Sequence, residues 1–138
     1  MYEYDWTVRF ADTDPHRIAH YPNIVVAIHD VSDRFMEAID FPFWELTGEH
    51  GYGLPIIEFH AEFSRPCHAG DVVTIQLTPD LGSRSVRFSY EAFHEDGSLA
   101  FSAYEQRACV PVDGESAMEI PDDLRAAMEA YTVDEDAE

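Results

Sequence analysis

The stretch NIVVAIHDVSDRFMEAI, residues 23–39, decides the fold, because it has the pattern of a largely buried helix. Its main apolar residues are spaced by four, three, four and four positions, which places them on one helical face: Ile24, Ile28, Val31, Phe35 and Ile39. Other apolar residues widen this stripe, so we expect the helix to be covered on most of its sides. Pro22 suits the first position of such a helix, where no intrahelical partner needs its N–H.

Segments on both sides of this helix alternate apolar with polar residues, which is the period of a β-strand. One alternating segment precedes the helix, at residues 4–10. Four more follow it, at residues 57–63, 73–77, 86–92 and 100–110. In the last segment, every second residue is expected on the same side of the sheet as the apolar residues of the other strands. These residues are Ala100, Ser102, Tyr104, Gln106, Ala108 and Val110.

Turn residues separate the later segments at 69–70, 79–83 and 95–97. Because short turns join neighbouring antiparallel strands, we predict an α+β fold: an antiparallel sheet of about five strands wrapped around a long central helix. Such a sheet cannot cover a helix on all sides, so we expect a second subunit, in a homodimer or homotetramer. We expect one domain over residues 1–132, ending in a helix at 120–131, and a solvated acidic tail at 133–138.

The charge of the chain limits its partners. The sequence has 28 acidic residues against 8 basic ones, all of them arginine, and a formal net charge of −20. Binding to nucleic acid or to an anionic membrane needs a basic surface, so we expect neither as a partner. This charge, together with the absence of lysine, leads us to predict a cytoplasm of high salt concentration, in which ions screen the self-repulsion of the protein.

Two cysteines, Cys67 and Cys109, have neither the spacing of a metal site nor that of a redox motif. We interpret them as small apolar residues in a reducing cytosol, and a single disulfide is the alternative. No stretch approaches the ~20 apolar residues of a membrane span, and the first residues lack the pattern of a signal peptide. We therefore expect a cytoplasmic protein.

The segment FADTDPHRIAHYPN, residues 10–23, concentrates reactive side chains at the passage from the first strand to the helix. The first N–H groups of a helix lack intrahelical partners and favour negative charge. Asp14 beside such groups supplies a nucleophile or base next to a site that stabilises an oxyanion, which is the arrangement of acyl transfer. Taken alone, however, a turn or capping role for Asp14 is the simpler interpretation.

The same segment contains two histidines, His16 and His20, four positions apart and close to two aspartates. This spacing suits a metal site on a helix, but two prolines bracket a loop here. A calcium loop needs glycine at its sixth position and glutamate at its twelfth, where this chain has Arg17 and Asn23. We expect no metal ion and no other cofactor.

Two groups of residues carry a resemblance to a known family. They are Phe10, Asp12, Asp14, Ile18 and Tyr21-Pro22-Asn23, then Phe63-Ser64-Arg65-Pro66 and Gly70-Asp71-Val72. Over roughly residues 4–112 the chain resembles hotdog-fold acyl-CoA thioesterases of the 4-hydroxybenzoyl-CoA thioesterase type. The resemblance implies hydrolysis of an acyl-CoA thioester to a free acid and CoA. It also implies that Asp14 attacks the thioester carbonyl or activates water, while the backbone amide of Tyr21 polarises the carbonyl oxygen.

The resemblance also bears on ligand binding. Family members usually carry glycine at or beside the positions of His16 and Arg17, where glycine lets the backbone approach the acyl group closely. These bulky side chains would narrow the acyl site or bind an acidic acyl chain. We expect the substrate to contact His16, Arg17, His20, Pro22 and Asn23. The phosphates of CoA suit arginine, and the candidates are Arg65, Arg84 and Arg87, for which pairing with nearby carboxylates is the alternative.

Two other functions stay open. A hotdog hydratase or dehydratase usually pairs a histidine with an acid, whereas here the histidines lie on the motif loop. A non-catalytic acyl-CoA-binding module would bind the same ligand without releasing its thiol. The sequence specifies neither the acyl group nor the choice between nucleophile and base for Asp14.

Overall fold

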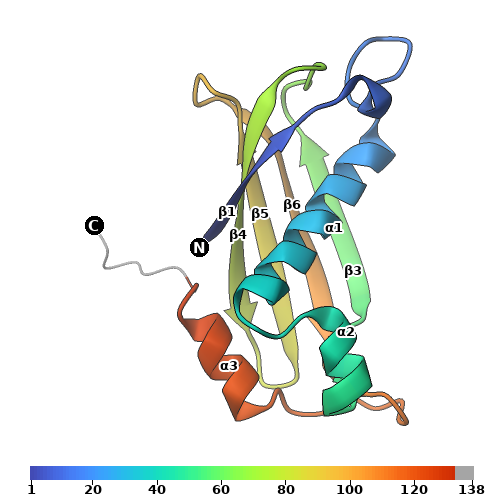
Figure 1. Ribbon diagram of the computed structural model, residues 1–138, viewed down its shortest axis with the longest axis vertical. Coiled ribbons are helices and arrows are strands. Elements are labelled where there is room, and N and C mark those ends of the chain that lie inside the picture. Colours follow the sequence, from blue (N-terminus) through green and yellow to red (C-terminus); the bar gives the residue numbers. More distant parts are fainter. Residues whose placement is uncertain (133–138) are drawn as a thin grey trace.

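The computed structural model describes residues 1–132, and its centre is an antiparallel sheet of five strands (Figure 1). In chain order the strands are β1 (Tyr2–Thr7), β3 (Ile56–Phe63), β4 (Val72–Leu81), β5 (Ser85–Phe93) and β6 (Leu99–Ala108). They lie side by side in the order β1-β4-β5-β6-β3, with every neighbouring pair antiparallel. The predicted antiparallel sheet is confirmed, and the acidic tail predicted at 133–138 lies outside the described residues.

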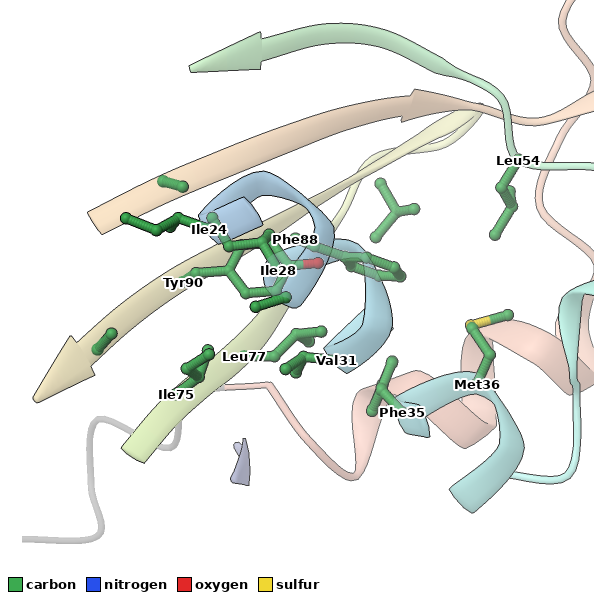
Figure 2. Packing of buried hydrophobic residues seen from close by; sticks show 14 of the residues in the cluster. Ile24, Ile28, Val31, Phe35, Met36, Leu54, Ile75, Leu77, Phe88 and Tyr90 are labelled. Atoms are coloured by element: carbon green, nitrogen blue, oxygen red, sulfur yellow. The ribbon is translucent and has the colours of Figure 1, made fainter. Parts of the chain in front are cut away.

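Helix α1 (Tyr21–Ala38) crosses one face of this sheet (Figure 1). Its buried residues are Ile24, Ala27, Ile28, Val31, Ser32, Phe35 and Met36. This side of the helix packs against the inward residues of β4 and β5 (Figure 2). Phe35 and Phe88 meet edge to face with ring centroids 5.6 Å apart, which is a geometry that aromatic pairs favour.

The prediction of a long helix covered on most sides is only partly met. Helix α1 has 18 residues, within the ~8–20 residues that are ordinary for helices of globular proteins. The sheet covers one face of the helix, whereas Val26 is 65% exposed and Tyr21 is 62% exposed. The five strands of a single chain therefore do not enclose the helix.

The remaining elements are short. They are the 3₁₀-helix η1 (Phe10–Asp12), α2 (Phe43–Glu45), the π-helix η2 (Leu46–His50), the paired strands β2 (Tyr52–Gly53) and β7 (Val110–Pro111), and α3 (Asp122–Glu129). The connector after α1 thus contains two short helical elements and one short strand. Within residues 1–132, no helix is long and apolar enough to cross a membrane.

A β-bulge reverses the predicted faces of β6. Ala92 pairs with Phe101 and Phe93 pairs with Leu99, so Ala100 is the extra residue between them. A shift of one residue moves every later side chain to the opposite face. The buried set after the bulge is therefore Phe101, Ala103, Glu105, Arg107 and Cys109, in place of the predicted set from Ser102 to Val110.

This reversal brings an ion pair into the core. Arg107 Nη2 lies 3.2 Å from Glu105 Oε1, and the Tyr90 hydroxyl donates to the same oxygen at 2.8 Å. Arg107 also donates to the carbonyl of Leu54 at 2.7 Å and to the Ser32 hydroxyl at 3.4 Å. Burial and the neighbouring Glu105 carboxylate raise the pKa of Tyr90, so its hydroxyl keeps the proton that it donates. The network joins the sheet to α1 and to the segment before β3.

The turn predicted at 79–83 is shorter in the structure. Strand β4 continues through Pro79 to Leu81, and the turn to β5 occupies residues 82–84. Strand β1 pairs with β4 only as far as Leu77, so Pro79 lies where β4 forms the edge of the sheet. Its missing N–H therefore breaks no ladder hydrogen bond.

Candidate active site

The residues after η1 form a tight loop that leads into α1. The Asp14 N–H donates to the carbonyl of Ile18 at 3.0 Å, and the Arg17 N–H donates to the carbonyl of Asp14 at 2.8 Å. Arg17 has a φ of 69°, in the left-handed region that glycine adopts without strain. Glycine near this position thus has a conformational advantage, and an arginine here costs about 1–2 kcal/mol.

Both ends of this loop are held by hydrogen bonds. The Ala19 N–H donates to the carbonyl of Cys67 at 2.8 Å, which ties the loop to the segment before β4. The carbonyl of Asp12 accepts the His20 N–H at 2.8 Å and the side-chain amide of Asn23 at 3.0 Å. Asn23 therefore fixes the start of α1 against the loop.

The Asp14 carboxylate is oriented by its own loop. One oxygen, Oδ1, accepts the His16 N–H at 2.8 Å. The other oxygen, Oδ2, lies 3.9 Å from Nδ1 of His20, which is beyond hydrogen-bonding distance. The side chain is 20% exposed, so the carboxylate is accessible but partly desolvated. One carboxylate oxygen is thus available to a ligand.

Within the described residues, helix α1 begins with one open N–H group, that of Tyr21, because Pro22 has no N–H and the Asn23 N–H donates to the carbonyl of His20 at 2.8 Å. His20 is the N-cap residue, and its side chain makes no capping hydrogen bond. The first helical residue, Tyr21, has an N–H that no backbone carbonyl of residues 1–132 accepts. The first turn also contains no acidic residue. Such an uncapped helix start stabilises negative charge.

A cavity of about 480 Å³ joins the carboxylate to the helix start. Asp14, His20, Tyr21 and Arg65 line it. The other walls are mostly apolar and include Ile18, Ile24, Phe63, Cys67 and Phe101. The structure therefore brings together the two sequence groups that carry the resemblance, one at residues 10–23 and one at residues 63–66.

Of the five residues expected to contact substrate, His20 lines this cavity and the other four do not. His16 and Arg17 are exposed on the loop, and Pro22 is exposed in the first turn of α1. Asn23 is half-buried and bonds the carbonyl of Asp12. These four residues shape the loop and the helix start from outside the cavity wall.

Arg65 is the one predicted CoA-binding arginine that lines the cavity. Its guanidinium donates to Asp96 at 2.7 Å and also bonds the Ser98 hydroxyl. Hydrogen bonds from Ser98 and Arg65 hold the pKa of Asp96 well below its usual range. Arg65 is therefore anchored at the β5–β6 turn, with one side facing the cavity.

The structure does not bring Arg84 and Arg87 to the same cavity. Arg84 lies in the β4–β5 turn, at the opposite end of the nine-residue strand β5, which spans about 30 Å. The Arg87 guanidinium stacks 3.9 Å above the ring of Tyr104 and donates to Gln106 at 2.9 Å. Within one chain, Arg84 and Arg87 therefore do not line the cavity that Arg65 lines.

The β-bulge in β6 supplies walls that the sequence pattern did not reveal. The consecutive residues Ala100 and Phe101 both line the cavity. The carbonyl of Ala100 accepts the N–H groups of Ser64 at 2.9 Å and of Arg65 at 3.1 Å, which holds the end of β3 in place. The run of three apolar residues Leu99, Ala100 and Phe101 in an otherwise alternating strand was the sequence signal of this feature.

Cys67 also lines the cavity, but it does not have the properties of a nucleophile. Burial raises the pKa of its thiol to about 11. Attack on a carbonyl requires the thiolate, which is scarce near neutral pH when the pKa is this high. Asp14 is therefore the reactive group with a free oxygen in this cavity.

A larger hollow, of about 710 Å³, lies on the outer face of the sheet. Polar side chains such as Gln76, Glu91 and Ser102 line it, and neither Asp14 nor the start of α1 reaches it. In the part of the chain that the structure describes, no group of three or more His, Cys, Asp or Glu side chains is placed to hold a metal ion.

The sequence matches the thioesterase-like superfamily over residues 8–128, which is most of the chain. The chain belongs to this superfamily. The match confirms the resemblance predicted from the sequence and, with it, the expectation of a thioester hydrolase with a hotdog-type fold.

Relatives of this thioesterase-like protein include a 1,4-dihydroxy-2-naphthoyl-CoA hydrolase from Nostoc punctiforme, 27% identical over 124 residues that cover 89% of this chain and 83% of the relative. A solved gentisyl-coenzyme A thioesterase is 26% identical, with a TM-score of 0.80 and coverage of 92% of this chain and 99% of that one. A Staphylococcus aureus protein solved in complex with CoA shares the fold, with a TM-score of 0.85 at 21% identity and coverage of 94% and 82%.

Proposed function

We propose that this protein hydrolyses an acyl-CoA thioester to a free carboxylic acid and CoA. The main support is that Asp14, whose Oδ2 is free of hydrogen bonds within residues 1–132, lines the same cavity as His20 and Tyr21 at the uncapped start of α1. A nucleophile or base and a site for the oxyanion are the two requirements of this reaction. The relatives named as CoA hydrolase and CoA thioesterase support the same chemistry.

In this mechanism the thioester carbonyl oxygen accepts a hydrogen bond from the Tyr21 N–H at the positive end of the helix dipole. The oxygen becomes negative as the carbonyl is attacked, and one such donor is typically worth about 3 kcal/mol. Asp14 acts as a nucleophile that forms a mixed anhydride, or as a base that activates water. In both routes the C–S bond breaks and CoA leaves as the thiol.

We further propose an aromatic acyl group as the substrate class. The cavity beside Asp14 has apolar walls that include the rings of Phe63 and Phe101. The printed substrates of the two relatives, 1,4-dihydroxy-2-naphthoyl-CoA and gentisyl-coenzyme A, both carry aromatic acyl groups. His16, Arg17, Pro22 and Asn23 would act on specificity through the shape of the loop and helix start.

Arg65 is our candidate for contact with the phosphates of CoA, because it is the arginine beside the proposed acyl site. The relative solved with CoA supports a CoA ligand for this fold. Arg84 and Arg87 reach the same ligand only when a second subunit brings the far end of its sheet to this cavity. We therefore propose them as contacts from a neighbouring subunit.

We also propose a homodimer or homotetramer. Strand β3 is an edge of the sheet, and it exposes the apolar side chains of Ile57 and Phe63. An exposed apolar edge strand offers unpaired backbone groups to another chain. A second copy would cover this edge and the open side of α1, where Val26 is exposed.

Release of free thiol from a panel of short, long, branched and aromatic acyl-CoAs tests the proposed function. We expect turnover to be highest with an aromatic member of the panel. Hydration of an enoyl-CoA without thiol release would identify a hydratase instead. Binding of acyl-CoAs with no thiol release across the panel would identify a non-catalytic binding module. Either outcome contradicts the proposal.

A further inference from the structure

His20 faces the free oxygen of Asp14 across a short gap. Its Nδ1 lies 3.9 Å from Asp14 Oδ2, and its side chain is 54% exposed where the cavity opens. The backbone of His20 is held by a hydrogen bond, and its ring has one packing partner in the described part of the chain. The backbone N–H of His20 donates to the carbonyl of Asp12 at 2.8 Å, and the ring packs against Tyr21 with centroids 5.4 Å apart and planes at 67°.

The gap between Nδ1 and Oδ2 is too long for a direct hydrogen bond and short enough for one water to bridge. A water about 2.8 Å from each atom satisfies ordinary hydrogen-bond distances. Asp14 Oδ1 is already occupied by the His16 N–H, so Oδ2 is the oxygen free to accept. Within residues 1–132, no protein group donates to Oδ2 or bonds the imidazole of His20.

We propose that His20 is a positioning residue that holds, together with Asp14, the water that attacks the thioester. This inference rests on the proposed function. The water donates one hydrogen bond to Asp14 Oδ2 and the other to Nδ1 of neutral His20. Both of its protons are then engaged, and its lone pair is directed at the carbonyl carbon, whose oxygen is bound by the Tyr21 N–H.

The reaction balances without another reactant. The water oxygen bonds to the carbonyl carbon while its proton passes to Asp14. The tetrahedral intermediate collapses, the C–S bond breaks, and the CoA sulfur takes the proton from Asp14. The products are the carboxylic acid and CoA thiol, and the Asp14 carboxylate is regenerated.

Two substitutions separate water positioning from simple packing. In H20N, the amide oxygen can take the place of Nδ1 as an acceptor. We expect its kcat to stay within about fivefold of wild type. In H20F, the ring packing on Tyr21 is kept and the acceptor is lost. We expect kcat to fall by about 10- to 100-fold while KM changes less than about threefold.

The opposite pattern would overturn the inference: H20F near wild type with H20N impaired would assign His20 a packing role. H29N is the matched control, because His29 is an exposed histidine further along α1, outside the cavity, and it should keep both kcat and KM.

A single turnover in H₂¹⁸O completes the test. We expect the label in the acid product and none in the peptide that contains Asp14. Label in Asp14 would show direct attack by the carboxylate and would overturn the role of His20 in holding the attacking water, while leaving the thioesterase function in place. No thiol release from wild type with any acyl-CoA, in contrast, would contradict the proposed function itself.

Discussion

The side chains of Glu105 and Arg107 form an ion pair of 3.2 Å inside the core, with 2% and 4% of their surfaces exposed. We predict that Arg107→Met lowers the free energy of unfolding by about 3–5 kcal/mol, because it leaves the Glu105 carboxylate buried without its partner. Urea unfolding of the variant measures this change.

The double variant Glu105→Gln with Arg107→Met should recover much of that loss, since no charge stays buried and the Tyr90 hydroxyl keeps an acceptor. The exposed pair of Arg34 and Asp30, 2.7 Å apart on α1, provides a control. Arg34→Met should lower stability by less than about 1 kcal/mol. Equal losses for the two single variants would mean that burial of the pair has no special effect.

The left-handed backbone of Arg17 gives a second prediction. Arg17→Gly should raise the free energy of unfolding by about 1 kcal/mol, because glycine adopts a φ of 69° without strain. Arg17→Ala keeps a Cβ and should gain little. Thermal or urea unfolding compares the two variants, and equal effects of glycine and alanine would rule out backbone strain as the cause.

Alkaline pH should destabilise the protein through Cys67. Burial raises the pKa of this thiol from 9.0 to about 11, so the folded state holds its proton where the unfolded state releases it. The resulting stability is complete below about pH 9 and is lost as the pH rises toward 11. Melting temperatures across this range should fall less steeply in Cys67→Ala. A variant with the same decline as wild type would show that other groups cause it.

The acidic surface predicts a dependence on salt. A net charge of −20 repels itself, and the Debye length shortens from about 10 Å at 0.1 M salt to about 3 Å at 1 M. We expect the melting temperature to rise between dilute buffer and molar KCl. An uncharged osmolyte at equal osmolarity is the control, and it should give a smaller rise. A melting temperature that does not rise in KCl would contradict the predicted adaptation to salt.

Much of the fold is predictable from the sequence because local patterns coincide with tertiary packing. The spacing of apolar residues in 23–39 follows the face of α1 that the sheet covers. Asp14 and Tyr21 are close in the chain at a passage from strand to helix, so local geometry suffices to place both in one cavity. The meeting of this loop with Phe63 and Arg65 is a long-range contact, and only the resemblance pointed to it.

The sequence pattern does not predict the faces of β6 or the distance of Arg84 from the cavity, because each depends on one residue or on the length of one strand. The face predicted for each side chain depends on unbroken alternation. The extra residue Ala100 therefore reversed the predicted faces of β6, and the pair of Glu105 and Arg107 was predicted to be exposed instead of buried. Arg84 lies apart from the cavity within one chain, because β5 separates its two turns by about 30 Å.

In the proposed mechanism Asp14 performs the chemistry, so the decisive measurement is kcat for thiol release by Asp14→Asn. Asparagine keeps an oxygen for the His16 N–H, so the loop should stay folded and CoA should still bind. The matched control is Asp12→Asn, because the Asp12 carboxylate bonds the Arg9 N–H at 2.8 Å and asparagine can do the same. We predict a fall in kcat of about 10²- to 10⁴-fold for Asp14→Asn and little change for Asp12→Asn. Wild-type turnover by Asp14→Asn would contradict the assignment.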